Sequence, residues 1–328
     1  MTLRNTLRLA GGALLAALVF LFGPSLSGPS LSGPMTAAAQ DAAPDEAAAY
    51  AAFHAASQGT DTAAALAAAK AYLDKYPSGQ YADAIKKWKD QARLTQLDAA
   101  IKDKRTADMI TIGKEILAAD PENLNVIYAL AFNIRRNELL AAPPVYTNAD
   151  AAVELANKGI GLIEAGKALT GVASFDKGAT LAWMTQILAI NAGRAGSAAD
   201  AIKLYEKSTA HAPSDPLVGR NLLAVVTLRQ SKYGEVAKAY NALPDADKTA
   251  AEPKPEVKAA KDALNNEADA LIDAAAGFVA YGRSKGLPAT TVDRVNQLLE
   301  TVYKGRFPED TALDGLKKIL AAKVTPSA

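Results

Sequence analysis

Three stretches of this chain end an apolar, helix-forming run on a proline. They read Ala-Tyr-Leu-Asp-Lys-Tyr-Pro at 71–77, Ile-Leu-Ala-Ala-Asp-Pro at 116–121 and Ser-Thr-Ala-His-Ala-Pro at 208–213. After each proline, a polar turn leads into another run with apolar residues at helical spacing. A proline cannot continue a helix, and helix pairs that recur along a chain stack on their neighbours. The pattern therefore predicts a stack of helix pairs.

Composition supports an all-helical chain. Apolar residues make up 50% of the 328 residues, alanine is prominent among them, and aromatic residues make up 6%. Alanine is the best helix former, and its small side chain lets helices approach closely. Because runs rich in Val, Ile and Thr with alternating polarity are missing, the sequence predicts almost no sheet.

Charge and cysteine content exclude several classes of function. The chain has 36 basic and 35 acidic residues, so no net charge would hold it on nucleic acid or on an anionic membrane. It has no cysteine, which excludes disulfides, thiolate catalysis, cysteine-ligated zinc, iron–sulfur clusters and a lipidated cysteine.

The chain begins with a basic start and a short apolar segment. Arg4 and Arg8 precede the uncharged run 9–22. This run is shorter than the roughly 20 residues of a bilayer-spanning helix. Together with the small residues that end at Ala39, this pattern predicts a secretory signal peptide over 1–39. We therefore expect an exported protein, periplasmic or secreted, with no stable membrane insertion after cleavage near Ala39. An uncleaved N-terminal anchor is the alternative.

The remaining chain divides into three parts. Apolar spacing predicts a helical repeat domain over 40–243, a proline-containing linker over 244–256 and a C-terminal helical region over 257–328. We expect the last region to cap the stack, because a terminal unit must cover an apolar end face. The predicted helices are 44–57, 62–76, 81–104, 106–119, 123–141, 149–165, 177–194, 198–211, 215–230, 232–242, 257–284, 289–304 and 311–323.

The stretch 182–215 resembles a tetratricopeptide repeat. The resemblance rests on small or apolar residues at set places on two helices and on a closing proline: Leu188, Ala189, Ala201, Tyr205, Ser208 and Pro213. A weaker resemblance extends over 46–243. The three helix-ending prolines are 44 and 92 residues apart, whereas the family repeats about every 34 residues, so we expect inserted loops. The resemblance implies a right-handed α–α superhelix that serves as a protein-interaction scaffold.

An arginine recurs near the end of the first helix in three of the predicted pairs. The residues are Arg136 with its neighbour Arg135, Arg194 and Arg229. In a tetratricopeptide-like stack the first helices line the concave face, where guanidinium groups would take carboxylates of an acidic protein or peptide partner. The alternative explanation is the helix dipole, which favours arginine near any helix C-terminus.

Polar and aromatic residues accompany these arginines on the same predicted helices. We expect the concave face to include Asn125, Tyr128, Phe132, Trp183, Gln186, Ile190, Asn221 and Val225. Aromatic residues at helical spacing are also typical of a core, so burial in the core is the alternative for this set.

No motif for chemistry accompanies this scaffold. His54 and His211 are far apart and lack the context of a metal site, and no glycine-rich phosphate loop or nucleophile elbow occurs. We therefore predict no catalytic, cofactor-binding or metal-binding residues. The charged face of 81–104 is typical of solvent exposure, and a surface for a partner helix is the alternative; its residues are Lys86, Lys87, Lys89, Asp90 and Arg93.

The sequence thus favours an exported, non-catalytic, tetratricopeptide-like scaffold that binds a protein or peptide in the bacterial cell envelope and needs no cofactor. One alternative is a helical carrier of carbohydrate or lipid, which would need a deep apolar pocket lined by Tyr128, Phe132 and Trp183. Another is a hydrolase on a helical toroid, which would need carboxylates that converge in a cavity. The sequence names neither the partner nor the oligomeric state.

Overall fold

A computed structural model describes residues 44–171 and 174–324 of the chain. These residues form thirteen α-helices and one π-helix, with no strand among them. The predicted all-α class is confirmed. None of the helices in the described ranges is long and apolar enough to cross a membrane. The predicted signal peptide and its cleavage site near Ala39 lie outside the described residues.

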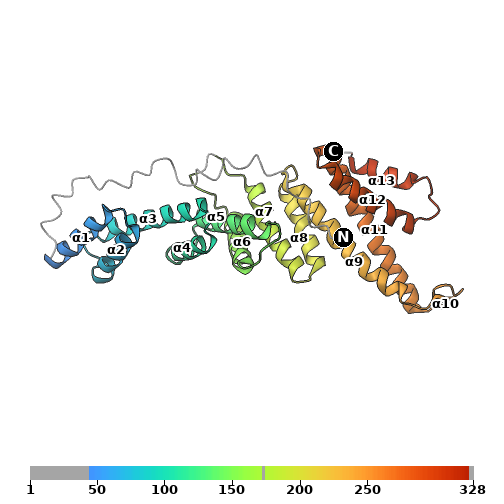
Figure 1. The fold of residues 1–328 in the computed structure, drawn as a ribbon, viewed down its shortest axis with the longest axis horizontal. Helices are drawn as coiled ribbons and strands as arrows, with labels where there is room; N and C mark the ends of the chain where they lie inside the picture. The colour runs from blue at the N-terminus through green and yellow to red at the C-terminus, as the bar shows by residue number, and fades with distance from the viewer. Residues whose placement is uncertain (1–43, 172–173, 325–328) are drawn as a thin grey trace. The chain divides into compact units, whose positions relative to one another are not determined.

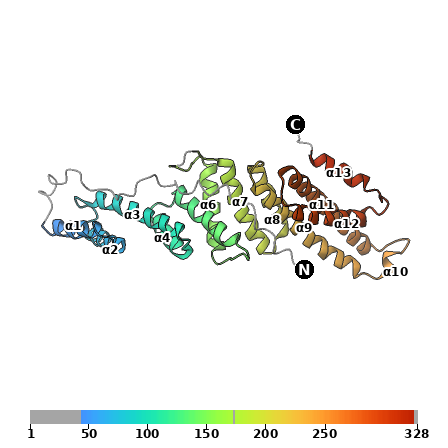
Figure 2. The same ribbon diagram turned by 45° about the horizontal axis from the view of Figure 1, so that its top comes forward.

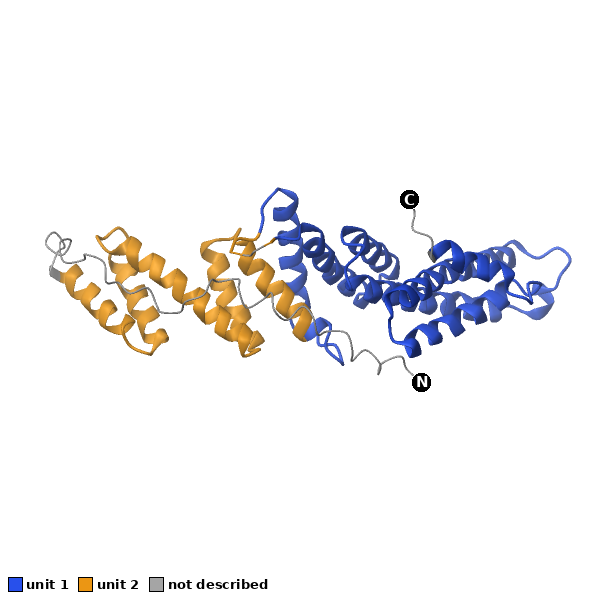
Figure 3. Cartoon of the chain, turned by 90° about the horizontal axis from the view of Figure 1, so that it is seen from above, with its two compact units in different colours: residues 1–10, 138–168, 175–328 blue, residues 11–137, 169–174 orange. Residues whose placement is uncertain are grey.

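The helices group into two compact units, which Figure 3 colours separately. The described part of unit 2 consists of 44–137 with 169–171 and Ser174, and that of unit 1 consists of 138–168 and 175–324. The division falls inside the π-helix, Arg135–Leu139. The predicted C-terminal region therefore belongs to the same unit as the helices before it.

Unit 2 is a succession of helices joined by short turns, each packed on the next (Figure 1). The helices are α1 (Pro44–Ser57), α2 (Thr62–Lys75), α3 (Ala82–Lys102), α4 (Thr106–Ala119) and α5 (Leu124–Ile134). The Asp61 carboxylate accepts a hydrogen bond from the Ala64 N–H at 3.0 Å, and the Asn123 side chain accepts one from the Val126 N–H at 3.1 Å. These caps satisfy backbone donors that a helix start leaves free, and so they fix where α2 and α5 begin.

Aromatic rings form the core of α1, α2 and the start of α3. Phe53, Tyr72 and Tyr81 are buried, and the Tyr50 ring stacks on Tyr81 with centroids 3.9 Å apart. The Tyr72 hydroxyl donates to the buried Glu46 carboxylate at 2.5 Å. A β-carbon at Gly79 would collide with the Glu46 carboxylate and the Tyr72 hydroxyl. Glycine therefore allows the turn between α2 and α3 to lie close to this hydrogen-bonded pair.

Unit 1 contains the remaining helices. They are α6 (Ala149–Glu164), α7 (Lys177–Arg194), α8 (Ala198–His211), α9 (Leu217–Asn241), α10 (Asp245–Lys248), α11 (Pro255–Lys285), α12 (Ala289–Arg306) and α13 (Asp314–Val324). Helices α6 to α9 pack in chain order, and α9 and α11 lie side by side in both ribbon views (Figure 2). Val226 of α9 belongs to the same buried apolar cluster as Leu271 and Phe278 of α11 and Leu299 of α12.

Three predicted helix boundaries differ from the structure. The predicted break near 231 is wrong, because α9 runs unbroken to Asn241: no proline interrupts it, and Gly234 is open to solvent there. The helix predicted over 123–141 ends at Ile134 and continues as the π-helix. The last helix begins at Asp314 rather than 311, since the Asp310 carboxylate accepts hydrogen bonds from the N–H groups of Asp314 (3.0 Å) and Gly315 (2.8 Å).

Candidate functional site

The predicted partner-binding residues are divided between the two units. Unit 2 holds Asn125, Tyr128, Phe132, Arg135 and Arg136, and unit 1 holds Trp183, Gln186, Arg194, Asn221 and Arg229. The predicted row of arginines along one face therefore draws on both units.

The two adjacent arginines of unit 2 differ in exposure. Arg135 is only 9% exposed, whereas Arg136 is exposed to solvent. Arg135 follows the end of α5 and lies inside the fold, where little of its guanidinium is open to a partner. Arg136 is the arginine of this pair that solvent, or a partner, can reach.

The aromatic residues predicted for unit 2 form a pair on α5. The rings of Tyr128 and Phe132 lie one turn apart and nearly parallel, with centroids 5.8 Å apart, and both side chains are half-buried. Burial raises the pKa of the Tyr128 hydroxyl, and the nearby Arg135 charge opposes this shift. Next to the pair, the Asn125 amide is used within the unit, since it bonds the backbone and hydroxyl of Thr170 at 2.9 to 3.0 Å.

The arginines predicted for unit 1 already have acidic partners. Arg194 lies 3.8 Å from the Asp150 carboxylate, and its guanidinium stands over the exposed Tyr146 ring at 5.4 Å. Arg229 is 3.5 Å from Glu267, a carboxylate that Lys232 also contacts at 2.6 Å. Arg229 and Lys232 thus share the largely buried Glu267 carboxylate, whereas the Arg194–Asp150 pair is exposed and weak and leaves Arg194 accessible to a partner.

Trp183, Gln186 and Asn221 are buried in unit 1. Thr180 to Ile187 are all buried, because α7 packs against α6, α8 and α9. The Asn221 side chain accepts from the Gln186 amide at 2.7 Å and donates to the Ser208 hydroxyl at 2.9 Å. This burial corrects the prediction that Trp183 and Gln186 line an open face: α7 is covered on every side there. The buried amides instead satisfy one another across three helices.

Unit 2 has an open groove of about 700 Å³ over α3, between α2 and α4. Its apolar lining comes from Leu66 and Leu73 of α2, Leu94 of α3 and Ile116 of α4. Leu66 is buried and the other three are half-buried, so the groove offers apolar surface that the described helices leave partly uncovered.

Charged side chains of both signs border this groove. The cations are Lys70, Lys89 and Arg93, and the carboxylates are Asp74, Asp90, Glu115 and Asp120. Lys70 pairs with Asp74 and Arg93 with Glu115, each at 2.5 Å. Asp90 and Asp120 have no ion-pair partner among the described residues. An apolar floor with a charged border is the usual composition of a protein-binding surface.

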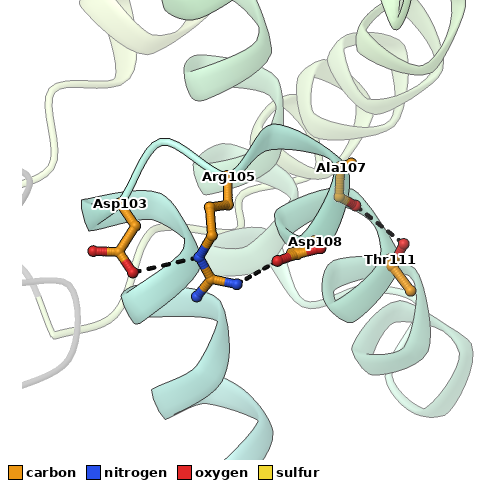
Figure 4. A network of polar contacts seen from close by, with 5 residues as sticks. All are labelled: Asp103, Arg105, Ala107, Asp108 and Thr111. Carbon is orange, nitrogen blue, oxygen red and sulfur yellow. Dashed lines mark hydrogen bonds and ion pairs between the residues drawn. The ribbon is translucent and has the colours of Figure 1, made fainter.

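Arg105 links two carboxylates in the turn between α3 and α4, two helices of the groove (Figure 4). Arg105 bonds Asp108 on one side and Asp103 on the other, the latter at 3.4 Å. The Asp108 contact raises the pKa of the Arg105 guanidinium above its ordinary value. Lys104 adopts a left-handed conformation with φ of 58°, which reverses the chain direction within the turn.

Unit 1 has a second groove, of about 510 Å³, over α9 between α8 and α11. Tyr205, Leu222, Val225 and Ala274 supply apolar surface. Arg229 reaches this groove, and Lys323 of α13 borders it while paired with Asp273 at 2.7 Å. Like the groove of unit 2, it lies over a central helix, between the long helices that precede and follow it.

The aromatic residues expected to line a carrier's ligand pocket lie outside both grooves. Neither groove is lined by Tyr128, Phe132 or Trp183, the residues that a ligand pocket was expected to use. Across the described ranges, no group of three or more His, Asp or Glu side chains is placed to hold a metal ion. His54 and His211 lie on different helices in different units.

The spacing of residues on α2 and α3 could have indicated the groove of unit 2, but the site prediction rested on the arginines. The lining residues of α2 fall at 63, 66, 67, 70, 73 and 74, a single helical stripe. On α3, the groove takes Lys89, Asp90 and Arg93 from the charged face for which a partner-helix surface was the alternative prediction. Sequence alone could not show that these stripes face one another.

Comparisons with known proteins provide no further assignment. A scan against protein-family models matched no family, and searches of curated proteins and of solved structures found no match.

Proposed function

We propose that this chain is an exported, tetratricopeptide-like scaffold that binds a protein or peptide partner in the bacterial cell envelope. In this proposal the signal peptide over 1–39 is removed, the helix pairs form a right-handed superhelix, and the C-terminal helices cap it. The chain performs no chemistry of its own. Its partner binds to helix grooves rather than to a row of arginines.

The observation that carries this proposal is the pair of grooves. Each lies over a central helix, α3 or α9, and has an apolar floor with charged residues at its edges. Open apolar surface with a charged border is costly to leave in water and is typical of binding sites.

The close approach of α7 and α8 supports the repeat-like part of the proposal. Ser208 is fully buried, and its hydroxyl donates to the Ala182 carbonyl at 2.6 Å. A β-carbon at Gly193 would lie 3.6 Å from that of Ala201. Small side chains at both crossings let the two backbones meet, as the repeat resemblance requires.

The packing of the last helices supports the capping role. Leu316 of α13 is buried, and Leu313, Ile319 and Leu320 pack on the cluster that α9, α11 and α12 share. An amphipathic helix in this position covers apolar surface that would otherwise end the stack exposed.

Site-specific photo-crosslinking in cells tests the proposal. A photoreactive residue would replace exposed alanines in the groove of unit 2 (Ala67, Ala119), and Glu206 or Ala210 in the groove of unit 1. The controls are Ala55 and Ala259, exposed alanines that line neither groove. We expect the groove positions of at least one unit to capture a discrete envelope protein that the control positions do not capture.

Equal capture from groove and control positions, or no discrete partner from any position, would contradict a scaffold role. N-terminal sequencing of the native protein tests export separately. A mature chain that begins near Gln40 is expected, and a start before residue 35 would contradict the cleavage site.

A further inference from the structure

We propose that the groove of unit 2 binds an amphipathic helix of the partner, about three turns long, with basic residues at one end. This inference rests on the proposed scaffold function and names the partner's structure and charge at one site. It follows from the length of the groove, its apolar floor, its charges and the way α13 docks in unit 1.

The length of the groove matches a short helix. The α2 stripe runs from Ala63 to Asp74, which at 1.5 Å per residue corresponds to about 16 Å, or three turns. Lining residues on α3 and α4 also recur at helical spacing, from Lys89 to Gln96 and from Glu115 to Asp120. Helices that pack on one another fit ridges of side chains into grooves of this kind.

The apolar floor of the groove favours the apolar face of an amphipathic partner helix over a polar peptide segment. Leu66, Leu73, Leu94 and Ile116 come from three helices and are not fully covered, except for Leu66. A helix with apolar residues at i, i+3, i+4 and i+7 would cover all four side chains at once. The charges of both signs along the borders would pair with the polar flanks of such a helix.

The charges are unevenly distributed along the groove. Its four carboxylates and three cations leave it one charge negative. The Arg93–Glu115 pair aligns α3 with α4, so Asp90, one turn before Arg93, and Asp120, just over one turn after Glu115, lie toward the same end. Asp74, in the last turn of α2 before the chain enters α3, lies toward that end as well.

This end of the groove therefore selects positive charge. Three carboxylates at this end, Asp74, Asp90 and Asp120, outnumber its two cations, Lys70 and Lys89. Asp90 and Asp120 have no ion-pair partner among the described residues. The Lys70–Asp74 pair is largely exposed and weak, so Asp74 can exchange partners. Lysine or arginine at the matching end of a partner helix would complement this set.

Unit 1 shows how this type of surface is covered by a helix. The eleven-residue α13 docks on α11 through Leu316 and its neighbours, and its Lys323 pairs with Asp273 of α11 at 2.7 Å. Helix α13 thus combines a leucine-rich face with a basic last turn against a carboxylate. The described residues of unit 2 include no helix in the corresponding role on α2 to α4.

Fluorescence anisotropy with chain 40–328 tests the inference. The probe is a designed helical peptide of about 15 residues, a length at which isolated helices become stable, with leucines at i, i+3, i+4 and i+7 and lysines in its last turn. An otherwise identical peptide carries glutamates in place of the lysines. We expect the lysine peptide to bind about tenfold more tightly, since a few border charge pairs contribute a few-fold each.

The double variant Asp90→Lys with Asp120→Lys should reverse this preference. Its matched control is Asp262→Lys with Asp293→Lys, which changes the net charge equally at exposed carboxylates of unit 1 that have no ion-pair partner among the described residues. Equal binding of the two peptides, no binding of either, or equal behaviour of the two double variants would overturn the inference.

The crosslinking experiment separates this inference from the scaffold proposal. Capture of a partner from Glu206 or Ala210 alone would overturn the inference and leave the scaffold role standing. Capture of a second copy of this chain from Ala67 and Ala119 would also overturn it, because the occupant would then not be a partner's helix.

Discussion

Helices α1 to α3 of unit 2 pack around aromatic rings, whereas α7 to α9 of unit 1 pack around small side chains and amide groups. In the first region, Phe53 meets the Trp88 ring edge-on at 5.1 Å. In the second, Asn221 joins Gln186 and Ser208 through hydrogen bonds. Rings fill volume and tolerate some adjustment, while a buried amide requires its partners at fixed positions. The first region should therefore depend on side-chain volume and the second on helix register.

The two tryptophans of the chain allow this difference to be measured in each unit. Trp88 lies in unit 2 and Trp183 in unit 1. Replacing either one with phenylalanine leaves a single fluorescent reporter for the other unit.

Removing ring volume from unit 2 should have the largest effect. Phe53 is 1% exposed, so Phe53→Ala should lower the free energy of unfolding by about 4 kcal/mol, through lost burial and the cavity left behind. Urea unfolding followed by Trp88 fluorescence measures this loss. If the aromatic core around Phe53 belongs to unit 2 alone, the urea midpoint reported by Trp183 should not change. Equal shifts of the midpoints reported by Trp88 and Trp183 would contradict separate cores.

Breaking the amide network of unit 1 should have the next largest effect. Asn221→Leu keeps the volume but removes the acceptor of the Gln186 amide and the amide donor to the Ser208 hydroxyl inside the core, which should cost about 3 kcal/mol. Unfolding followed by Trp183 fluorescence measures it. Asn157→Leu, at an exposed position on α6, is the control and should change stability by less than about 0.5 kcal/mol. A similar small change at both positions would show that the network does not specify the packing.

Removing the Tyr72 hydroxyl from the aromatic core of unit 2 should have a smaller effect. Tyr72→Phe keeps the ring and loses the hydrogen bond to Glu46, so we expect a loss of about 1 to 2 kcal/mol near neutral pH. A loss above about 3 kcal/mol would indicate that unit 2 depends on polar pairing as strongly as unit 1 does.

The same tyrosine predicts an alkaline limit for unit 2. Burial, and then the hydrogen bond to Glu46, raise the pKa of Tyr72 from 10.0 to about 12. The folded state favours the neutral phenol of Tyr72. The contribution of Tyr72 to the free energy of unfolding is therefore complete below pH 10 and is lost as pH rises from 10 to about 12. Trp88-monitored stability should fall over this range, and Tyr72→Phe should flatten the fall; Tyr146→Phe, at an exposed ring, should not.

The smallest effect should come from His211 at the end of α8. Burial lowers the pKa of His211 below 6.5, and Lys207 lowers it further, while Glu164 acts in the opposite direction. The folded state favours the neutral imidazole of His211. The contribution of His211 to the free energy of unfolding is therefore present above pH 6.5 and is lost as pH falls below that value. His211→Gln should reduce the acid-side decline reported by Trp183; an unchanged pH profile would contradict a role for this histidine.

Most of the helix boundaries could be predicted from sequence because they depend on local signals. The side chains of Asp61, Asn123 and Asp176 cap the helices that follow them. The helices α2, α4 and α8 each end two residues before a proline. The predicted break in α9 near 231 had no strong local signal, since no proline lies within 217–241, and α11 packs along this helix. The start of α13 likewise depends on Asp310, which lies outside the helix.

The candidate site was less predictable than the helices. Trp183 and Gln186 were predicted for the concave face with burial in the core as the alternative, and the structure buries them. Helical spacing does not show whether another helix covers a face. Arg194 and Arg229 carry the expected charge, but the sequence could not show that Arg229 lies beside the largely buried Glu267 of another helix. The groove of unit 2 uses Lys89, Asp90 and Arg93, which the sequence assigned to solvent by default.

By itself, the sequence determined the all-helical class, the positions of most helix ends and the absence of cysteine chemistry. These depend on intrinsic propensity, capping and residue type, which act within a few residues. Tertiary structure decided which arginines are paired, which polar residues are buried, and where apolar floors stay open between helices. Those outcomes depend on side chains far apart in the chain, and helical periodicity gives the direction of a face without naming the helix that covers it.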